Sequence, residues 1–196
     1  DKVVARLTAW ESRHVNPEGE IIEVLGPAKA PGIDMLSVIR KYALPEEFPP
    51  AVLQEVEKVA DTIDPAEIAR REDSRSQFVI TIDPDDAKDF DDAILVERIS
   101  GKGGRPAGWR LSVHIADVSH YVRPGTALDG EAKGRGNSTY LADRVLPMLP
   151  EKLSNGVCSL KPQVDRLTFA AFIDFDDKGQ PVHARFARAV IRSAAR

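Results

Sequence analysis

Residues 78–96 read FVITIDPDDAKDFDDAILV, and this stretch decides how the rest of the chain is interpreted. Apolar residues lead into it at 78–80 and leave it at 93–96, as in two strands joined by a loop. The loop holds six aspartates and one lysine: Asp83, Asp85, Asp86, Asp89, Asp91, Asp92 and Lys88. Carboxylates crowded at the rim of a strand repel one another, and a divalent cation is the usual compensation. The stretch therefore predicts a cation site.

The spacing of the aspartates predicts which of them converge. Asp83 stands where the first apolar run ends, and Pro84 stops that strand's hydrogen-bond ladder. The aspartates at 89, 91 and 92 come later, at the entrance to the next strand. A loop of this length brings its ends together, so three or four carboxylate oxygens can meet one hard cation, Mg²⁺ or Mn²⁺.

Successive residues in an extended segment point to opposite sides. Asp91 and Asp92 therefore divide their roles, and we expect Asp91 to orient water or substrate rather than act as a plain ligand. Asp85 and Asp86 lie in the middle of the loop, and we expect them to be solvated.

Three other interpretations of the acidic stretch compete with a site for Mg²⁺ or Mn²⁺. An EF-hand calcium loop fails, because Lys88 stands at its glycine position and Ile94 at its distal glutamate. The Asp-x-Asp pair of haloacid-dehalogenase phosphatases fits Asp89 and Asp91 loosely, but Ala93 stands where those enzymes carry threonine or valine. A merely solvated acidic loop is the third interpretation, and the flanking apolar strands disfavour it.

Composition narrows the class of protein. The chain has 196 residues, is 42% hydrophobic and 30% charged, and has no apolar run of membrane-spanning length, so we expect no membrane association. Cys158 is the only cysteine, which excludes a disulfide framework and favours a cytoplasmic location. The net charge is −4, yet residues 93–196 carry sixteen Lys and Arg against ten Asp and Glu. A negative spot beside a basic segment suits a metal site that serves a polyanion.

The hydrophobic pattern predicts an α+β protein. Strands are expected over 2–9 and 20–25, and helices over 33–41 and from 51 onward. Strands are then expected over 78–82, 93–99 and 109–116, with a loop over 100–108. The segments 126–135 and 150–157 are expected to be helical. The segments 167–175 and 182–191 are expected to form a hairpin, and alternation along 109–116 predicts a half-buried strand.

Four blocks of this sequence, in order, resemble the RNB domain of the ribonuclease II/ribonuclease R family. They are TIDPDDAKDFDDA (81–93), HIADVSHYV (114–122), GNSTYL (136–141) and LPMLPEKLSNGVCSL (146–160). Their detail is closer to the ribonuclease R branch. Residues 1–26 resemble the C-terminal strands of an OB-type cold-shock barrel. The resemblance implies three parts: the end of that barrel over 1–26, a linker with helices over 27–64, and the N-terminal part of a mixed α/β RNB catalytic domain over 65–196.

The resemblance also implies an activity. The family hydrolyses single-stranded RNA processively from 3′ to 5′ and releases nucleoside 5′-monophosphates. Its metal-binding aspartates match Asp83, Asp89 and Asp92, with Mg²⁺ as the cofactor and Mn²⁺ as an alternative. The aspartate most critical for cleavage matches Asp91, and Tyr140 matches a tyrosine that contacts RNA bases.

Some expected parts of the family's site do not match any residue of this chain. The resemblance places the catalytic arginine, a nucleotide-clamping tyrosine and a C-terminal RNA-binding barrel beyond Arg196. We therefore expect the chain to belong to a longer monomeric protein and to be nearly inactive alone. The competing hypotheses are a non-catalytic RNA-binding module and a metal phosphohydrolase that acts on small molecules.

Overall fold

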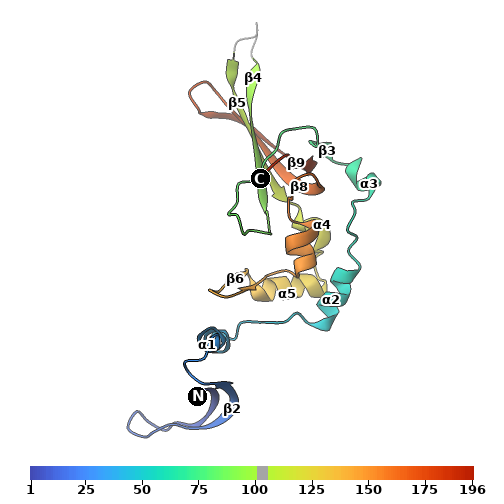
Figure 1. Ribbon diagram of the computed structural model, residues 1–196. Helices are drawn as coiled ribbons and strands as arrows, with labels where there is room; N and C mark the ends of the chain where they lie inside the picture. The colour runs from blue at the N-terminus through green and yellow to red at the C-terminus, as the bar shows by residue number, and fades with distance from the viewer. Residues whose placement is uncertain (101–105) are drawn as a thin grey trace. The chain divides into compact units, whose positions relative to one another are not determined.

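The computed structural model describes residues 1–100 and 106–196 (Figure 1). The chain divides into two compact units. Unit 1 consists of Asp1–Pro49 together with Gly134–Met148, and unit 2 of Pro50–Lys133 together with Leu149–Arg196. The loop expected over 100–108 falls mostly on 101–105, which lie outside the described residues.

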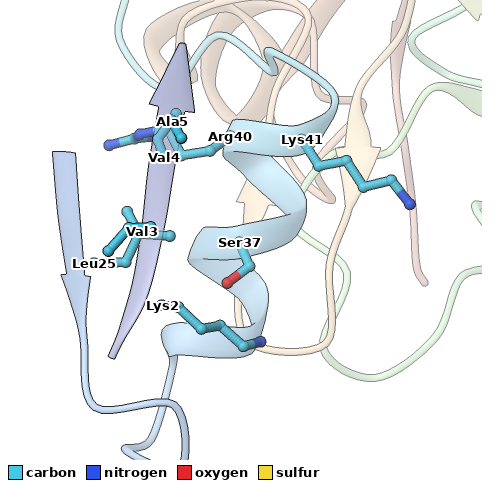
Figure 2. A pocket seen from close by; sticks show the side chains of 8 residues that line it. All are labelled: Lys2, Val3, Val4, Ala5, Leu25, Ser37, Arg40 and Lys41. Carbon is cyan, nitrogen blue, oxygen red and sulfur yellow. The ribbon is translucent and has the colours of Figure 1, made fainter. Parts of the chain in front are cut away.

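Unit 1 is built on a hairpin and a helix. Strand β1 (Lys2–Ala9) pairs antiparallel with β2 (Glu18–Gly26), and α1 (Ile33–Lys41) follows. The Arg40 guanidinium joins helix to hairpin by donating to both carboxylate oxygens of Glu23, at 2.8 and 3.0 Å. Figure 2 shows the cavity of about 350 Å³ between β1 and α1, with Lys41 extending away from the hairpin. A short second hairpin, β6 (Thr139–Tyr140) with β7 (Val145–Leu146), completes the unit.

Unit 2 is organised around a five-stranded sheet of order β3-β9-β8-β5-β4. The strands are β3 (Glu72–Asp73), β4 (Asp92–Ser100), β5 (Pro106–Ala116), β8 (Asp165–Phe175) and β9 (Pro181–Arg192). Only β3 runs parallel to its neighbour, and the other pairs are antiparallel. The long hairpin of β8 and β9 confirms the pairing expected around the turn at Asp176, whose carboxylate accepts from the backbone N–H groups of Lys178 and Gln180.

Short helices accompany the sheet. They are α2 (Pro50–Glu57), α3 (Pro65–Ile68), α4 (Val118–Tyr121) and the six-residue π-helix η2 (Lys152–Val157). Helix α5 (Ala127–Arg135) begins in unit 2 and ends in unit 1. The Asp64 carboxylate caps α3 by accepting from Ala66 N–H at 2.8 Å, a role for which aspartate is among the preferred residues. Among the described residues, no helix has both the length and the apolar character needed to cross a bilayer.

Two sequence expectations need correction. The strand expected over 78–82 is not a strand, because only Ile80 makes ladder contacts, as isolated bridges to Ile94 and Ala195. Pro84 and the aspartates that follow prevent its extension. In β5 the half-buried alternation is present, but the polar face is the buried one: Ser112 and His114 are buried, whereas Ile115 is 48% exposed. Strand β5 thus contributes polar side chains to the buried side of the sheet, beside apolar residues of the other strands such as Phe172.

Candidate active site

The acidic loop, residues 81–91, is closed by a two-bond bridge at its base. Ile80 N–H donates to Ile94 O at 3.0 Å, and Ile94 N–H donates to Ile80 O at 2.8 Å. Phe90 is buried and anchors the far end of the loop beside the start of β4. The bridge therefore brings the two ends of the loop together. Asp83 follows the first bridging residue closely, and the aspartates at 89–92 shortly precede the second.

A clamp from a distant part of the chain fixes the loop's backbone. The Ser159 hydroxyl donates to Lys88 O at 2.7 Å and accepts from Phe90 N–H at 3.1 Å. Leu160 N–H donates to Phe90 O at 2.8 Å. Arg166 holds Ser159 in turn, since its guanidinium donates to Ser159 O at 2.7 Å. The segment that carries Asp89 and Asp91 is therefore held rigidly from the side opposite to solvent.

Sequence reasoning missed this clamp. Ser159 is completely buried within the apolar run Val157–Leu160, and that position was the one available signal. A serine among buried apolar residues needs hydrogen-bond partners. The sequence does not tell which ones, because the partners lie about seventy residues away, as the separation of 69 between Ser159 and Phe90 shows.

The electrostatics of the loop centre on Asp91. Partial desolvation raises the pKa of its carboxyl group, although the residue as a whole is exposed. The negative charges of the aspartates at 89, 92 and 83, in that order, raise this pKa further. No side-chain hydrogen bond or ion pair involves Asp91 within the described part of the chain. The other three aspartates expected at the site therefore all raise the pKa of Asp91. Asp85, by contrast, lies 3.5 Å from the Arg196 guanidinium.

Donor chemistry at the loop suits a hard cation. Asp83 Oδ2 is buried and meets no hydrogen-bond donor among the described residues, so one carboxylate oxygen is desolvated without compensation. Within 1–100 and 106–196, no three His, Cys, Asp or Glu side chains are gathered closely enough to hold a metal ion. Mg²⁺ commonly takes one or two carboxylates and completes its shell with water and substrate phosphate. The residues fit Mg²⁺ in that mode, and the set of Asp83, Asp89 and Asp92 stays a prediction.

A second charged cluster lies in the same unit, around Arg71. Its guanidinium is 2.7 Å from Asp117 and 2.7 Å from Glu67, and it also donates to Thr168 O at 3.2 Å. Burial raises the pKa of Asp117, but hydrogen bonds from Ser119 and Arg71 outweigh it and leave this pKa below its ordinary value. This cluster ties α3, α4 and β8 together and has a structural role.

Three other residues with titratable side chains are His114, Cys158 and Tyr140. His114 is buried in β5 with Nδ1 3.2 Å from Thr168 Oγ1, and burial lowers its pKa to about 4. Cys158 is a buried free thiol whose pKa burial raises to about 12. Tyr140 lies in unit 1, on β6, and is 66% exposed. Its role in RNA contact stays a prediction.

Comparisons with known proteins agree with the motifs. Residues 71–196 match the RNB domain family, and residues 1–49 match the cold shock domain family. The chain is 45% identical to ribonuclease R of Thermotoga maritima over its whole length, covering 27% of that protein. It is 44% identical to ribonuclease R of Escherichia coli over 99% of the chain, covering 23% of that protein.

Solved structures are also similar to this chain. Mycoplasma genitalium RNase R in complex with double-stranded RNA superposes with a TM-score of 0.87 at 32% identity, over 99% of this chain and 34% of that one. The yeast pseudonuclease Ssd1 superposes with a TM-score of 0.74 over 98% of this chain and 24% of that one, at 16% identity, which shows a shared fold alone. The chain spans about a quarter of the length of the two curated relatives above. The expected α+β fold, with a cold-shock part before an RNB part, is confirmed.

Proposed function

The chain belongs to the RNB domain family, and on that premise we propose that it carries the metal-binding part of a hydrolytic 3′→5′ exoribonuclease. The observation that supports this most strongly is the acidic loop. The charges of its neighbouring aspartates and burial raise the pKa of Asp91, and one carboxylate oxygen of Asp83 is buried without a hydrogen-bond donor among the described residues. A protein stabilised for its own sake would pair or neutralise such charges. A site that awaits a cation and a phosphodiester keeps them.

The proposed reaction divides the aspartates by role. Asp83, Asp89 and Asp92 hold Mg²⁺, or Mn²⁺ in its place. The bound ion supplies a Lewis acid for the phosphodiester oxygen and lowers the pKa of water. Asp91 orients the attacking water through a carboxylate oxygen and accepts its proton. The water oxygen bonds to phosphorus, and the bond from phosphorus to the 3′ oxygen of the preceding nucleotide breaks. That 3′ oxygen takes up a proton from solvent and stays on the shortened RNA, while a nucleoside 5′-monophosphate leaves.

The substrate we propose is single-stranded RNA, degraded processively by a monomeric cytoplasmic protein. Tyr140 supports this proposal as an exposed ring on which a base can stack. The relatives with this chain's features are several times longer than the chain, so the complete activity is proposed for the full-length protein.

The test is incubation of the full-length protein with single-stranded RNA of defined length and Mg²⁺. We expect release of 5′-mononucleotides from the 3′ end, with loss of release on addition of EDTA and in Asp91→Asn. Conversion of most of the RNA without intermediates of middle length would support processivity. Tight RNA binding with no release in any divalent cation would reject the proposal and leave a non-catalytic RNA-binding module.

A further inference from the structure

Unit 1 contains a small pocket of its own. Its lining includes Tyr42, Leu44, Pro45, Asn137, Thr139 and Leu146, and its volume is about 240 Å³. Pockets for drug-sized ligands occupy roughly 300–1,000 Å³, so this one suits a single planar ring system. Both sides of the pocket belong to one compact unit, since the segment after α1 and the β6–β7 hairpin both lie in unit 1.

An exposed aromatic ring stands at the pocket with a cation beside it. Tyr42 is 63% exposed, and Lys41 Nζ lies 5.2 Å from the centre of its ring. Lys41 extends away from the β1–β2 hairpin (Figure 2), and its ammonium over the Tyr42 ring gives a phosphate beside a base at this ring a positive charge to meet. Base stacking on aromatic rings with nearby basic groups is the general means of binding single strands.

The pocket lining also offers hydrogen-bonding groups in an apolar frame. The Asn137 amide carries both donors and an acceptor, and the Thr139 hydroxyl can donate or accept. Neither side chain makes a hydrogen bond to another described residue. Leu44, Pro45 and Leu146 supply apolar walls. An amide beside a stacking ring reads the edge of a base in the same way as asparagine reads adenine.

The backbone at the pocket is held in an unfavourable conformation. Ala43 has φ of 49°, a left-handed conformation that is rare for alanine, directly between Tyr42 and Leu44. Arg135 joins the segment after α1 to the segment after β7, because its guanidinium donates to Pro45 O at 3.1 Å and to Pro147 O at 3.1 Å. Non-glycine residues persist in such conformations where surrounding contacts impose them, and they cluster at ligand sites.

We propose that this pocket is a subsite for one base of single-stranded RNA. The base stacks on Tyr42, its edge bonds to Asn137 and Thr139, and its phosphate meets Lys41. The inference rests on the proposed function for its ligand, but it concerns residues that the acidic loop does not use. The subsite contributes to affinity and has no part in bond cleavage.

The test uses the full-length protein carrying Asp91→Asn, so that RNA is bound without being consumed, and measures fluorescence anisotropy with single-stranded RNA. We expect Tyr42→Ala to weaken binding about tenfold, because one stacked base is lost, and Tyr42→Phe to bind within about twofold of the parent. Asn137→Ala should weaken binding less and flatten the preference among bases. Gln180→Ala, on the exposed β8–β9 turn, is the matched control and should leave affinity unchanged.

A crosslinking measurement makes the same test directly. RNA that carries 5-iodouridine should crosslink to the peptide containing Tyr42, and the crosslink should disappear in Tyr42→Leu, which keeps an apolar side chain if the alanine variant fails to fold. Parental affinity in folded Tyr42→Ala or Tyr42→Leu, or crosslinks only at other residues, would overturn the subsite. If the protein without Asp91→Asn still releases mononucleotides in that case, the proposed function stands. A protein that neither binds nor degrades RNA overturns both.

Discussion

Unit 2 holds two groups of charged side chains in opposite ways. Around Arg71, the carboxylates of Glu67 and Asp117 each meet the guanidinium at 2.7 Å, and both have a lowered pKa. For Glu67 the hydrogen bond from Arg71 is the main cause, and for Asp117 such bonds overcome burial. In the acidic loop, burial and neighbouring carboxylates raise the pKa of Asp91 instead.

The difference separates a group that stabilises the fold from one that we propose serves function. A buried carboxylate with its own cation and hydrogen bonds contributes to a single stable structure. Like charges that raise the pKa of a neighbouring carboxyl group, as around Asp91, cost stability, and such perturbed groups cluster at functional sites. The clamp by Ser159 explains how the loop tolerates this, since backbone hydrogen bonds hold what the side chains would push apart.

The largest expected effect removes the cation from the paired group. Arg71→Met should lower the free energy of unfolding by about 3–5 kcal/mol, because Asp117 stays buried without a partner. Urea unfolding at pH 7 measures it. The matched control is Arg75→Met, which breaks more exposed pairs with Asp73 and Asp165 and should cost about 1 kcal/mol or less. Equal losses in the two variants would remove the distinction.

The next effect loosens the acidic loop without changing its charge. Ser159→Ala should lower kcat for RNA hydrolysis by the full-length protein about 10- to 100-fold with little change in KM, because the backbone beside Asp89 and Asp91 loses its clamp. Ser154→Ala is the control, since its hydroxyl makes one hydrogen bond among the described residues, to the Asn155 side chain at 3.5 Å. A rise in KM with unchanged kcat would show that Ser159 serves RNA binding instead.

A pH series tests the buried inner face of the sheet. Because burial lowers the pKa of His114 to about 4, the folded state resists the proton that the unfolded chain binds below its ordinary value of 6.5. Stability is therefore complete above pH 6.5 and falls as the pH drops toward 4, by about 2 kcal/mol at pH 4.5. His114→Leu should lose this acid-dependent part in urea unfolding, whereas His183→Leu, at an exposed site on β9, should keep it. Identical pH slopes in all three proteins would contradict the assignment.

The smallest expected effect is the change in the free energy of unfolding when Asp91 is replaced. Its sign distinguishes the acidic loop from the group around Arg71. Asp91→Asn should leave stability unchanged or raise it by about 0.5 kcal/mol at pH 7 without divalent cations, since it removes one of several like charges at a partly exposed site. Asp117→Asn should destabilise the fold, because it weakens the ion pair with Arg71. The comparison would fail if Asp91→Asn were destabilising to a similar extent.

Much of the architecture could be predicted from local sequence patterns. The Asp64 cap, the β8–β9 hairpin and the entry of the aspartates into β4 follow from turn, cap and strand signals within a few residues. Two features depended on long-range contacts and could not be predicted. The buried side of β5 is decided by what covers the sheet, so Ser112 and His114 are inside against their polarity. The clamp joins Ser159 to Phe90 across 69 residues.

The central claim is that Asp83, Asp89, Asp91 and Asp92 form the reacting site and that the other two aspartates of the loop do not. The most direct test is the rate of mononucleotide release by six single Asp→Asn variants of the full-length protein at saturating RNA and Mg²⁺. Variants at 83, 89, 91 and 92 should each lose about 10²-fold or more, with the greatest loss at Asp91. Variants at Asp85 and Asp86 should keep nearly the parental rate. Comparable losses at all six positions, or the largest loss at 85 or 86, would contradict the account.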